Sequence, residues 1–455
     1  MPASNHRTPR IAVLADSDTR WKWGALTAGR LAPEGATTDG YLLRGRATPT
    51  ERQLAEVGLR PDALAEVPLA GFLAELRRRH ADAAAAPYDL VVLALVGGAV
   101  QAALHGLARL GQEHGVRPVV VTGYVGVVYE KLADGLLLRH GADLVLANSA
   151  VDAERFRAVY EGVGADSTAV TEAALPFLGG APHRPAGPGD RPYTVVFAAQ
   201  PSVPAGRADR AHLLDRLIGH ARAHPDREVL LKLRSKPGEH TTHLEEIPYQ
   251  RLARDRGPLP ENLRLVHGNM GEVLDRTDLL VTVSSTAALE SLHRSIPTAV
   301  LTDLGVREAL GNHHFIGSGC LTSFDRLDEG HTPVADPTWQ DRNGVAPGTA
   351  YAGAFDTARA RTAALLKLAG AEELPPITPY YTPRTAPGYL PGLLARHHLA
   401  PDGTPLPGAL DPAPAEGLRG RARTAVNGAV RGAARAAYRH GVQNVAPLVR
   451  RLGRL

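Results

Sequence analysis

The chain has 455 residues, which is enough for two or three domains of ordinary size. Hydrophobic residues make up 44% and charged residues 22%, a balance that excludes a chain disordered throughout. The single cysteine, Cys320, excludes an internal disulfide framework and a cysteine-based zinc site. Aromatic residues, at 5%, are too few for a base-stacking platform.

The positive charge is concentrated at the C-terminal end. The net charge is +4, but Gly417–Leu455 holds nine arginines and no acidic residue, which leaves −5 for residues 1–416. The body lacks the basic footprint of a nucleic-acid-binding protein, so no nucleic-acid partner is predicted. The arginine-rich end has helical spacing. It predicts a solvated or protein-docked helix, or charge-driven adsorption to an anionic membrane surface.

The apolar segments are short. Residues 90–104 form the most apolar window, which Gly97-Gly98 interrupts, and it falls short of the ~20 residues of a membrane span. No leader pattern precedes Ile11. We therefore expect a cytoplasmic protein that could lie at the inner face of the cell membrane through its basic tail.

Strands alternate with helices along the first 160 residues. Continuous apolar runs predict buried parallel strands, and each is followed by a polar or glycine-containing turn and a helical pattern. Ser149 or Asn148 could cap the helix 151–160. The predicted strands are 11–15, 90–95, 118–122 and 144–147, and the helices are 21–31, 100–110 and 151–160.

The alternation stops at a Gly/Pro-rich linker, residues 179–192, and then restarts. Two parallel-sheet α/β domains are therefore predicted, with ligands bound at the cleft between them. The second set comprises strands 194–199, 229–233, 263–267, 279–283 and 298–302, and helices 211–223, 287–294 and 354–368, the last of which closes the second domain.

These patterns define four regions. They are an N-terminal Rossmann-like domain (1–180), a C-terminal Rossmann-like domain (193–374), a proline-rich segment (375–414) expected to wrap the surface as extended chain, and an arginine-rich helical tail (415–455). The sequence contains no Walker phosphate loop, Gly-x-Gly-x-x-Gly turn, Gly-x-Ser-x-Gly elbow or His-Glu-x-x-His motif, which disfavours the corresponding enzyme classes.

Three consecutive hydroxyls follow the predicted strand 279–283 and precede a helix. Ser284, Ser285 and Thr286 predict a phosphate site, because free backbone N–H groups and the helix dipole favour an anion there. The alternative is simple N-capping, which needs only one hydroxyl. Glu290, one turn later, could accept bonds from a ribose or be an ordinary exposed helix residue.

A basic segment follows the strand 229–233. Lys232, Arg234 and Lys236 could stabilise a phosphate leaving group, or form a solvated basic loop. His240 ends this segment. His240 and His243 are two nearby histidines with no third ligand to complete a metal site, so no metal and no cofactor are predicted.

Acidic residues follow the first predicted strand. Asp16 or Asp18 is the expected general base on an acceptor hydroxyl, the alternative being helix capping by Asp18. Tyr124 and Glu130, after the third strand, are candidates for the acceptor side.

Three stretches resemble a known enzyme class. Residues 275–290 are similar to the serine-pair motif of bacterial sialyltransferases and capsule-type ulosonic-acid transferases, and 231–237 to the lysine-rich approach to their His-Pro motif. Residues 141–156 are similar to the last strand and helix of the N-terminal domain in Kdo-transferase-like enzymes. The two-domain plan resembles GT-B glycosyltransferases, which implies that the N-terminal domain (1–180) binds the acceptor and the C-terminal domain (193–374) binds the nucleotide sugar.

The resemblance implies a metal-independent glycosyltransferase. Ser284, Ser285 and Thr286 would hold the donor phosphate, and Lys232, Arg234 and Lys236 would stabilise the leaving nucleotide. Asp16 or Asp18 would match the family's catalytic acidic residue near the first strand and deprotonate the acceptor. Where the family has His-Pro, this chain has Pro237-Gly238-Glu239-His240, so His240 is the expected substitute.

The implied reaction moves a sugar from a nucleotide donor to a cell-surface glycopolymer or lipid-linked acceptor. A CMP-ulosonic acid is the favoured donor, and a UDP-sugar is the other candidate. Two alternatives stay open: a sugar-nucleotide epimerase of the same fold, and a non-catalytic sugar-nucleotide-binding or scaffold relative.

Overall fold

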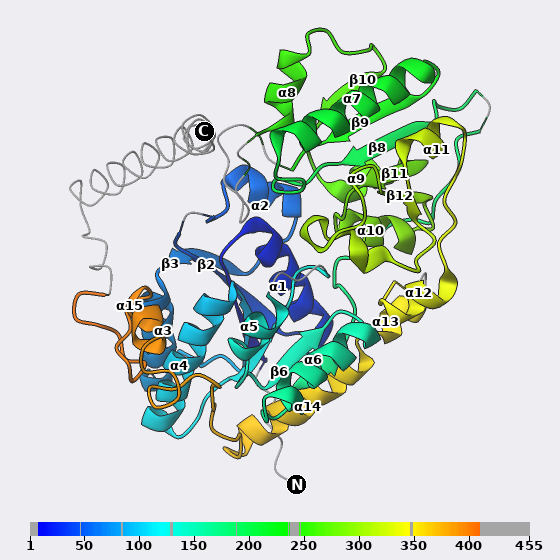
Figure 1. Ribbon diagram of the computed structural model, residues 1–455. Helices are drawn as coiled ribbons and strands as arrows, with labels where there is room; N and C mark the ends of the chain where they lie inside the picture. The colour runs from blue at the N-terminus through cyan, green and yellow to red at the C-terminus, as the bar shows by residue number, and fades with distance from the viewer. Residues whose placement is uncertain are drawn as a thin grey trace. The chain divides into compact units, whose positions relative to one another are not determined.

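The computed structural model describes residues 8–45, 47–82, 85–127, 131–187, 189–234, 236, 245, 247–345 and 349–409. The chain divides into two compact units (Figure 1). The first comprises residues 1–177 together with a returning C-terminal segment that includes 349–409. The second comprises residues 178–341. Each unit contains one parallel sheet, so the prediction of two α/β domains is confirmed.

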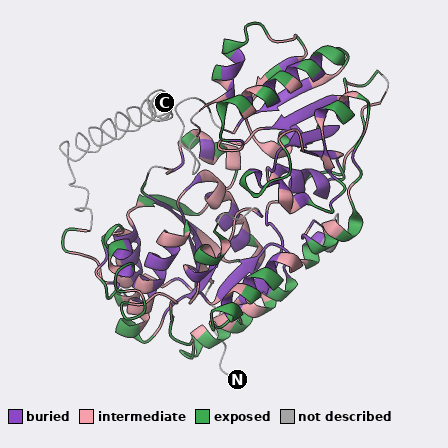
Figure 2. Cartoon of the chain, viewed as in Figure 1, coloured by how far each residue is buried: buried purple, intermediate pink, exposed green. Residues whose placement is uncertain are grey.

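The first unit contains a seven-stranded parallel sheet in the order β3-β2-β1-β4-β5-β6-β7. Its central strands are buried on both faces (Figure 2), as their continuous apolar sequences predict. Alternate residues of these strands enter two separate cores, one on each face. The strands are β1 (Arg10–Ala15), β2 (Thr37–Leu43), β3 (Ala63–Val67), β4 (Leu90–Ala94), β5 (Val119–Gly123), β6 (Leu144–Ala147) and β7 (Val170–Glu172).

Helices cover both faces of this sheet. They begin at small polar caps in three cases: Ser17 caps α1, Thr50 forms a capping box on α2, and Ser149 caps α6 by accepting the Asp152 N–H at 3.0 Å. The Ser149 prediction is confirmed, whereas α1 is capped by Ser17 and not by Asp18. The helices are α1 (Asp18–Leu31), α2 (Glu51–Val57), α3 (Leu69–Ala81), α4 (Gly97–His114), α5 (Leu132–Leu137) and α6 (Ala150–Gly162).

The second unit contains a six-stranded parallel sheet in the order β10-β9-β8-β11-β12-β13. Its strands are β8 (Thr194–Ala198), β9 (Glu228–Lys232), β10 (Leu263–Val266), β11 (Leu279–Thr282), β12 (Thr298–Leu301) and β13 (Leu321–Thr322). Its helices are α7 (Arg207–Ala223), α8 (Tyr249–Asp255), α9 (Met270–Leu274), α10 (Ala287–His293), the 3₁₀ turns η1 (Glu308–Leu310) and η2 (Asn312–Phe315), and α11 (Phe324–Asp328). Helix α12 (Pro337–Arg342) lies at the end of this unit, and α13 (Thr349–Gly353) belongs to the first unit.

The region between β1 and β4 contains four elements that the sequence did not predict: β2, α2, β3 and α3. Strand β2 contains the buried Asp39, which accepts hydrogen bonds from Arg10 and Tyr88, so its apolar pattern is interrupted. Strand β3 is an exposed edge strand and shows no apolar alternation. Short edge strands of this kind leave a weak periodic signal.

Helix α14 (Asp356–Gly370) belongs to the first unit, which corrects the expectation that it closes the second domain. It packs against α1, β5 and β7. Ala358 lies in the core on the α1 face of the sheet, and Arg361 donates to the Val170 carbonyl and the Thr171 hydroxyl of β7. Tyr351, just before α14, donates to the Leu175 carbonyl at 2.6 Å. Apolar spacing alone could not show which sheet this helix covers.

The proline-rich segment returns along the first unit. Arg117, in a bidentate pair with Asp143, also donates to the Pro375 carbonyl, and the α4 side chain of His105 contacts the Tyr381 carbonyl at 3.0 Å. A helix that the sequence did not predict, α15 (Leu390–Ala395), adds three leucines to the core. The tail at 410–455 lies outside the described residues.

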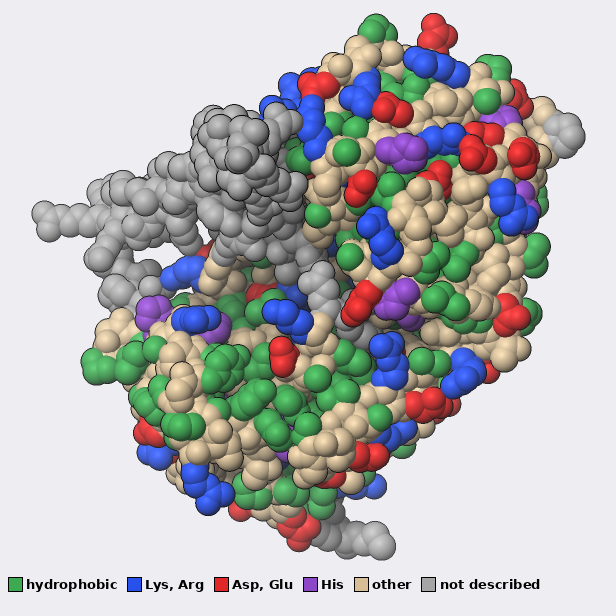
Figure 3. Space-filling model, viewed as in Figure 1, with side chains coloured by type: hydrophobic (Ala, Val, Ile, Leu, Met, Phe, Trp, Pro, Cys, Tyr) green, Lys and Arg blue, Asp and Glu red, His purple; other side chains and the backbone are tan. Residues whose placement is uncertain are grey.

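The surface carries charges of both signs. On the face shown in Figure 3, Lys and Arg side chains are interspersed with Asp and Glu. Within the described part of the chain, no helix combines the length and the apolar character needed to cross a bilayer.

Asp278 fastens the linker 179–192 to the second sheet. Its buried carboxylate, which is 1% exposed, receives a bidentate pair from Arg191, the N–H groups of Ala186 and Thr194, and a contact from His183 at 3.3 Å. Burial opposes ionisation of Asp278. The bonds from Arg191 and the two N–H groups outweigh it and lower the pKa of this carboxyl group.

Asp278→Asn should lower the free energy of unfolding by roughly 2–3 kcal/mol. Breaking a fully buried ion pair costs about 3–5 kcal/mol, and the loss is smaller here because the Arg191 side chain reaches water. The pKa of Asp278 is lowered by folding, so its stabilisation is full above about pH 4 and is lost as the pH falls. Urea unfolding at pH 7 and pH 3.5 measures this. Asp325→Asn, which removes an exposed pair with Arg216, is the matched control. Equal stability of the two variants at pH 7 would contradict the assignment.

Candidate functional site

The strand orders place a candidate site in each unit. In both sheets the chain adds strands on one side of the first strand and then on the other. The order therefore reverses between β1 and β4, and between β8 and β11. Open α/β sheets bind ligands beyond the carboxyl ends of the strands at such a switch point. The loops after β1 and β11 carry half of the residues that the sequence singled out, and the others lie at or after the neighbouring strands β5 and β9.

The carboxyl ends of three strands in the second unit are level. Ala198 of β8 pairs in register with Lys232 of β9 and with Thr282 of β11. Gln200, Arg234 and Ser284 each lie two residues beyond these positions. Because neighbouring strands are about 4.8 Å apart, the basic segment and the hydroxyl segment leave the sheet about two strand spacings apart. The fold therefore brings both predicted groups to one edge of the sheet.

Ser284 is engaged in internal bonds. Its backbone N–H donates to the Gln200 side-chain oxygen at 3.0 Å, and its hydroxyl donates to the Leu310 carbonyl at 2.6 Å. The Gln200 amide in turn donates to the Ser284 hydroxyl oxygen at 3.2 Å. Ser284 therefore joins the loops after β8, β11 and β12. These contacts favour a positioning role for it over direct contact with a phosphate.

Ser285 and Thr286 are only partly buried. The Ser285 hydroxyl accepts the Ala287 N–H at 3.2 Å, so it provides the capping interaction that the simpler interpretation requires. Thr286, the residue before α10, makes no side-chain cap bond. Of the three hydroxyls, these two keep an exposed face, and the phosphate prediction depends on them.

Glu290 and Lys232 are buried, at 8% and 6% exposure. Glu290 is therefore not the exposed helix residue of the alternative interpretation. The Lys232 ammonium donates to the Leu233 carbonyl at 2.8 Å, which holds it at the end of β9. Arg234 and Lys236 follow β9, and His240 lies outside the described residues.

A buried arginine that the sequence did not single out shapes the loop after β8. Arg210 of α7 donates through one nitrogen to the carbonyls of Gln200, Pro201 and Pro204. Its other terminal nitrogen donates to Glu245 at 2.7 Å, and its guanidinium lies 4.2 Å from the ring centroid of Tyr249. Arg210 thus fixes the backbone from which the Gln200 side chain reaches Ser284.

Burial raises the pKa of Glu245 to about 7, although Arg210 opposes the shift by its charge and hydrogen bond. Burial also raises the pKa of Tyr249 to about 12. The ion pair beneath the loop therefore titrates near neutral pH. Nothing in the sequence distinguishes Arg210 from an ordinary helix arginine.

Asp16 bridges the switch point of the first sheet. One carboxylate oxygen accepts the Val96 N–H, beyond β4, at 2.8 Å, and the other pairs with Arg20 at 2.9 Å. Both oxygens are thus bonded within the protein, which favours a positioning role. Asp18 is the first residue of α1, where a carboxylate interacts favourably with the helix dipole, and it accepts a bond from the Thr19 hydroxyl at 3.3 Å.

A second buried arginine joins the loops after β4 and β5. Arg139 donates to the carbonyls of Leu95 and Gly123, at the ends of β4 and β5, and its guanidinium lies 4.1 Å from the Tyr124 ring centroid. Burial raises the pKa of Tyr124. Glu130 lies outside the described residues. Sequence reasoning found Tyr124 from its place after a strand but gave no signal for Arg139.

The fold and these loops define an α/β protein with two parallel sheets of Rossmann type, each with polar side chains gathered at its switch point. Residues 11–365, more than half of the chain, match the family described as "Putative glycosyltransferase (DUF6716)", and the chain belongs to that family.

Solved structures with a similar chain course share little sequence with this protein. The UDP-GlcNAc 2-epimerase of Neisseria meningitidis bound to UDP-GlcNAc is 11% identical, with 79% of this chain and 100% of that chain covered and a TM-score of 0.48. Anabaena HepE in complex with UDP and glucose is 13% identical, with 80% and 100% covered and a TM-score of 0.45. The kitacinnamycin glycotransferase is 15% identical, with 81% and 100% covered and a TM-score of 0.41. No curated protein matches the sequence.

Arg210→Met should destabilise the protein by about 3 kcal/mol at pH 8. At this pH the buried Glu245 is charged, and the substitution removes the arginine that pairs with it. The loss should be smaller at pH 5.5. There Glu245, with its pKa of about 7, is mostly protonated. Urea midpoints at the two pH values measure the difference. Arg256→Met, which breaks the surface pair with Asp215, should show no such pH dependence. The same loss for Arg210→Met at both pH values would contradict the argument.

Proposed function

We propose that this member of the family transfers a sugar from a nucleotide-activated donor to an acceptor hydroxyl. The observation that carries the proposal is the level arrangement of Ala198, Lys232 and Thr282, from which the basic and hydroxyl segments leave one edge of the second sheet. A donor phosphate suits this combination of cations, hydroxyls and a helix start.

We assign the second unit to the donor. Ser285 and Thr286 would hold the phosphate, while Gln200 and Ser284 fix the loops around it. Lys232, Arg234 and Lys236 would stabilise the negative charge that develops on the leaving nucleotide, and Glu290 would accept bonds from the ribose. The resemblance of 275–290 to ulosonic-acid transferases favours a CMP-activated donor, with a UDP-sugar as the other candidate.

We assign the first unit to the acceptor. Asp18 would remove the proton from the acceptor hydroxyl as its oxygen forms a bond to the anomeric carbon. The bond from that carbon to the phosphate oxygen breaks, and the electron pair leaves with the nucleotide. Asp16 holds the loop that carries Asp18, since both of its oxygens are bonded to Val96 and Arg20. A glycopolymer or lipid-linked glycan is the acceptor class proposed.

The donor assignment predicts selective stabilisation by one nucleotide. The melting temperature is measured with CMP, CDP, UDP, UMP, GDP and ADP. We expect CMP to raise it, or UDP if the donor is a UDP-sugar. Ser285→Ala and Thr286→Val together should weaken that nucleotide at least tenfold. Ser323→Ala, which removes the cap of α11, is the matched control with unchanged affinity. A folded sample that responds to no nucleotide would favour the non-catalytic alternative.

The acceptor assignment predicts a separation of turnover from binding. Asp18→Asn should lower turnover at least a hundredfold while nucleotide affinity stays within twofold, because a missing base affects the transition state only. Product analysis with donor alone and with acceptor distinguishes transfer from epimerisation. Full turnover in Asp18→Asn would remove Asp18 from the mechanism, and conversion of the donor without an acceptor would favour an epimerase.

A further inference from the structure

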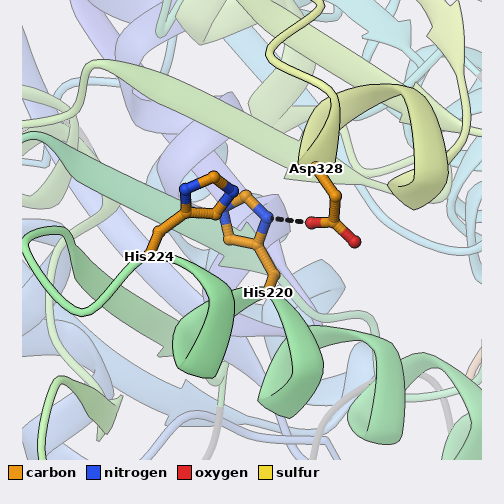
Figure 4. Close-up of side chains that lie close together, drawn as sticks. All are labelled: His220, His224 and Asp328. Atoms are coloured by element: carbon orange, nitrogen blue, oxygen red, sulfur yellow. Dashed lines mark hydrogen bonds and ion pairs between the residues drawn. The ribbon is translucent and has the colours of Figure 1, made fainter.

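A histidine pair and an aspartate converge at the far end of α7 from the loop after β8. His220 lies in the last turn of α7, His224 follows it as the C-terminal cap, and Asp328 is the last residue of α11. Figure 4 shows the two imidazole rings next to each other, tilted by 50°, and the Asp328 carboxylate directed at the His220 ring. The ring centroids are 4.6 Å apart.

The cluster has the composition of a metal site. One ligand atom from each of the three side chains lies within 4.8 Å of the other two. Two nitrogens and one carboxylate oxygen suit Zn²⁺, which binds such ligands at ~2.0–2.2 Å and keeps tetrahedral ligands about 3.3 Å apart. Rotation of the side chains would bring the three ligand atoms to these distances around the ion, and water would complete the coordination.

His224 supplies an independent indication. Its Nε2 atom is buried and has no hydrogen-bond partner within the described part of the chain. A buried imidazole nitrogen normally has a partner, and a metal ion would supply one. The spacing of four residues between His220 and His224 places both rings on one helix face, as in helical zinc-binding pairs.

His220 and Arg216 contact different oxygens of Asp328, so a metal ion would take the place of the proton between Asp328 and His220. Asp328 Oδ1 is 2.6 Å from His220 Nδ1, whereas Arg216 contacts the other oxygen, Oδ2, at 3.2 Å. Arg216 would therefore orient the carboxylate from behind without competing for Oδ1. Arg227 approaches His220 Nε2 at 3.4 Å, longer than an ordinary hydrogen bond, and also lies 5.1 Å from the Tyr193 ring centroid.

We propose that His220, His224 and Asp328 form a divalent-metal site, best suited to Zn²⁺, that clamps the end of α7 to α11. The site lies away from the candidate donor residues, because α7 leads from the carboxyl end of β8 back to the start of β9 at Glu228. Its role would be structural. The two helices already pack against each other, and the ion would add a direct link between their ends.

The test is metal titration of the full-length protein after removal of metal with EDTA and dialysis. Co²⁺ binding is followed by visible absorption, and Zn²⁺ binding by calorimetry and by the melting temperature. We expect one ion per chain and a melting temperature that rises by several degrees with Zn²⁺. His224→Ala and Asp328→Asn should each weaken binding at least tenfold. His212→Ala, at an exposed histidine of the same helix, should leave binding unchanged.

His224 is only partly buried, so its variant should fold, and circular dichroism would verify this. The absence of saturable binding to the wild-type protein would overturn the proposal, leaving the cluster as a hydrogen-bonded ion pair. Binding that survives His224→Ala would overturn it as well. Loss of binding in a His240→Ala/His243→Ala double variant, with His224→Ala unaffected, would assign the ion to those histidines instead.

Discussion

Both sheets of this protein are bridged at the same topological position. In the first, the Asp16 carboxylate crosses from the end of β1 to the Val96 N–H beyond β4. In the second, the Gln200 amide crosses from the end of β8 to the Ser284 N–H beyond β11. The paired strands are held at a fixed spacing by their ladder, but the loops beyond them lead to helices on opposite sides of the sheet. Each bridge holds the two loops of its own sheet together where they leave the strands.

Buried arginines perform the complementary task of holding loop backbones. Arg210 donates hydrogen bonds to three carbonyls of the loop after β8, and Arg139 donates to carbonyls at the ends of β4 and β5. A planar guanidinium with five donors can satisfy several carbonyls at once, which a lysine cannot do. Burying the charge is costly, so each is stabilised where it lies: Arg139 by Tyr124, and Arg210 by Tyr249 and Glu245. The polar loops gain a rigid base beneath them.

The sequence predicted the two sheets because their central strands are continuous apolar runs followed by turns. It located Asp16, Lys232 and Ser284 at strand ends, and the structure brings the last two to one edge. The sequence could not separate a positioning residue from a ligand. The difference lies in contacts between segments that are distant in sequence: the Ser284 hydroxyl donates to the Leu310 carbonyl, and the Asp16 carboxylate accepts the Val96 N–H. Gln200, Arg139, Arg210 and the His220–His224–Asp328 cluster were missed for the same reason, and β2 and β3 because polar or exposed strands lack a strong period.

The return of α14 and the proline-rich segment to the first unit has a consequence for biosynthesis. The second unit is nearly continuous from 178 to 341, whereas the first needs residues 349–409 to cover its sheet. During translation, β5 and β7 are synthesised long before the helix that packs on them, because α14 begins 233 residues after the end of β5 and 184 residues after the end of β7. Although its strands are synthesised first, the first unit is therefore the last to finish folding. Until then, the apolar face that α14 covers stays exposed, which is the state in which chaperones act on a chain.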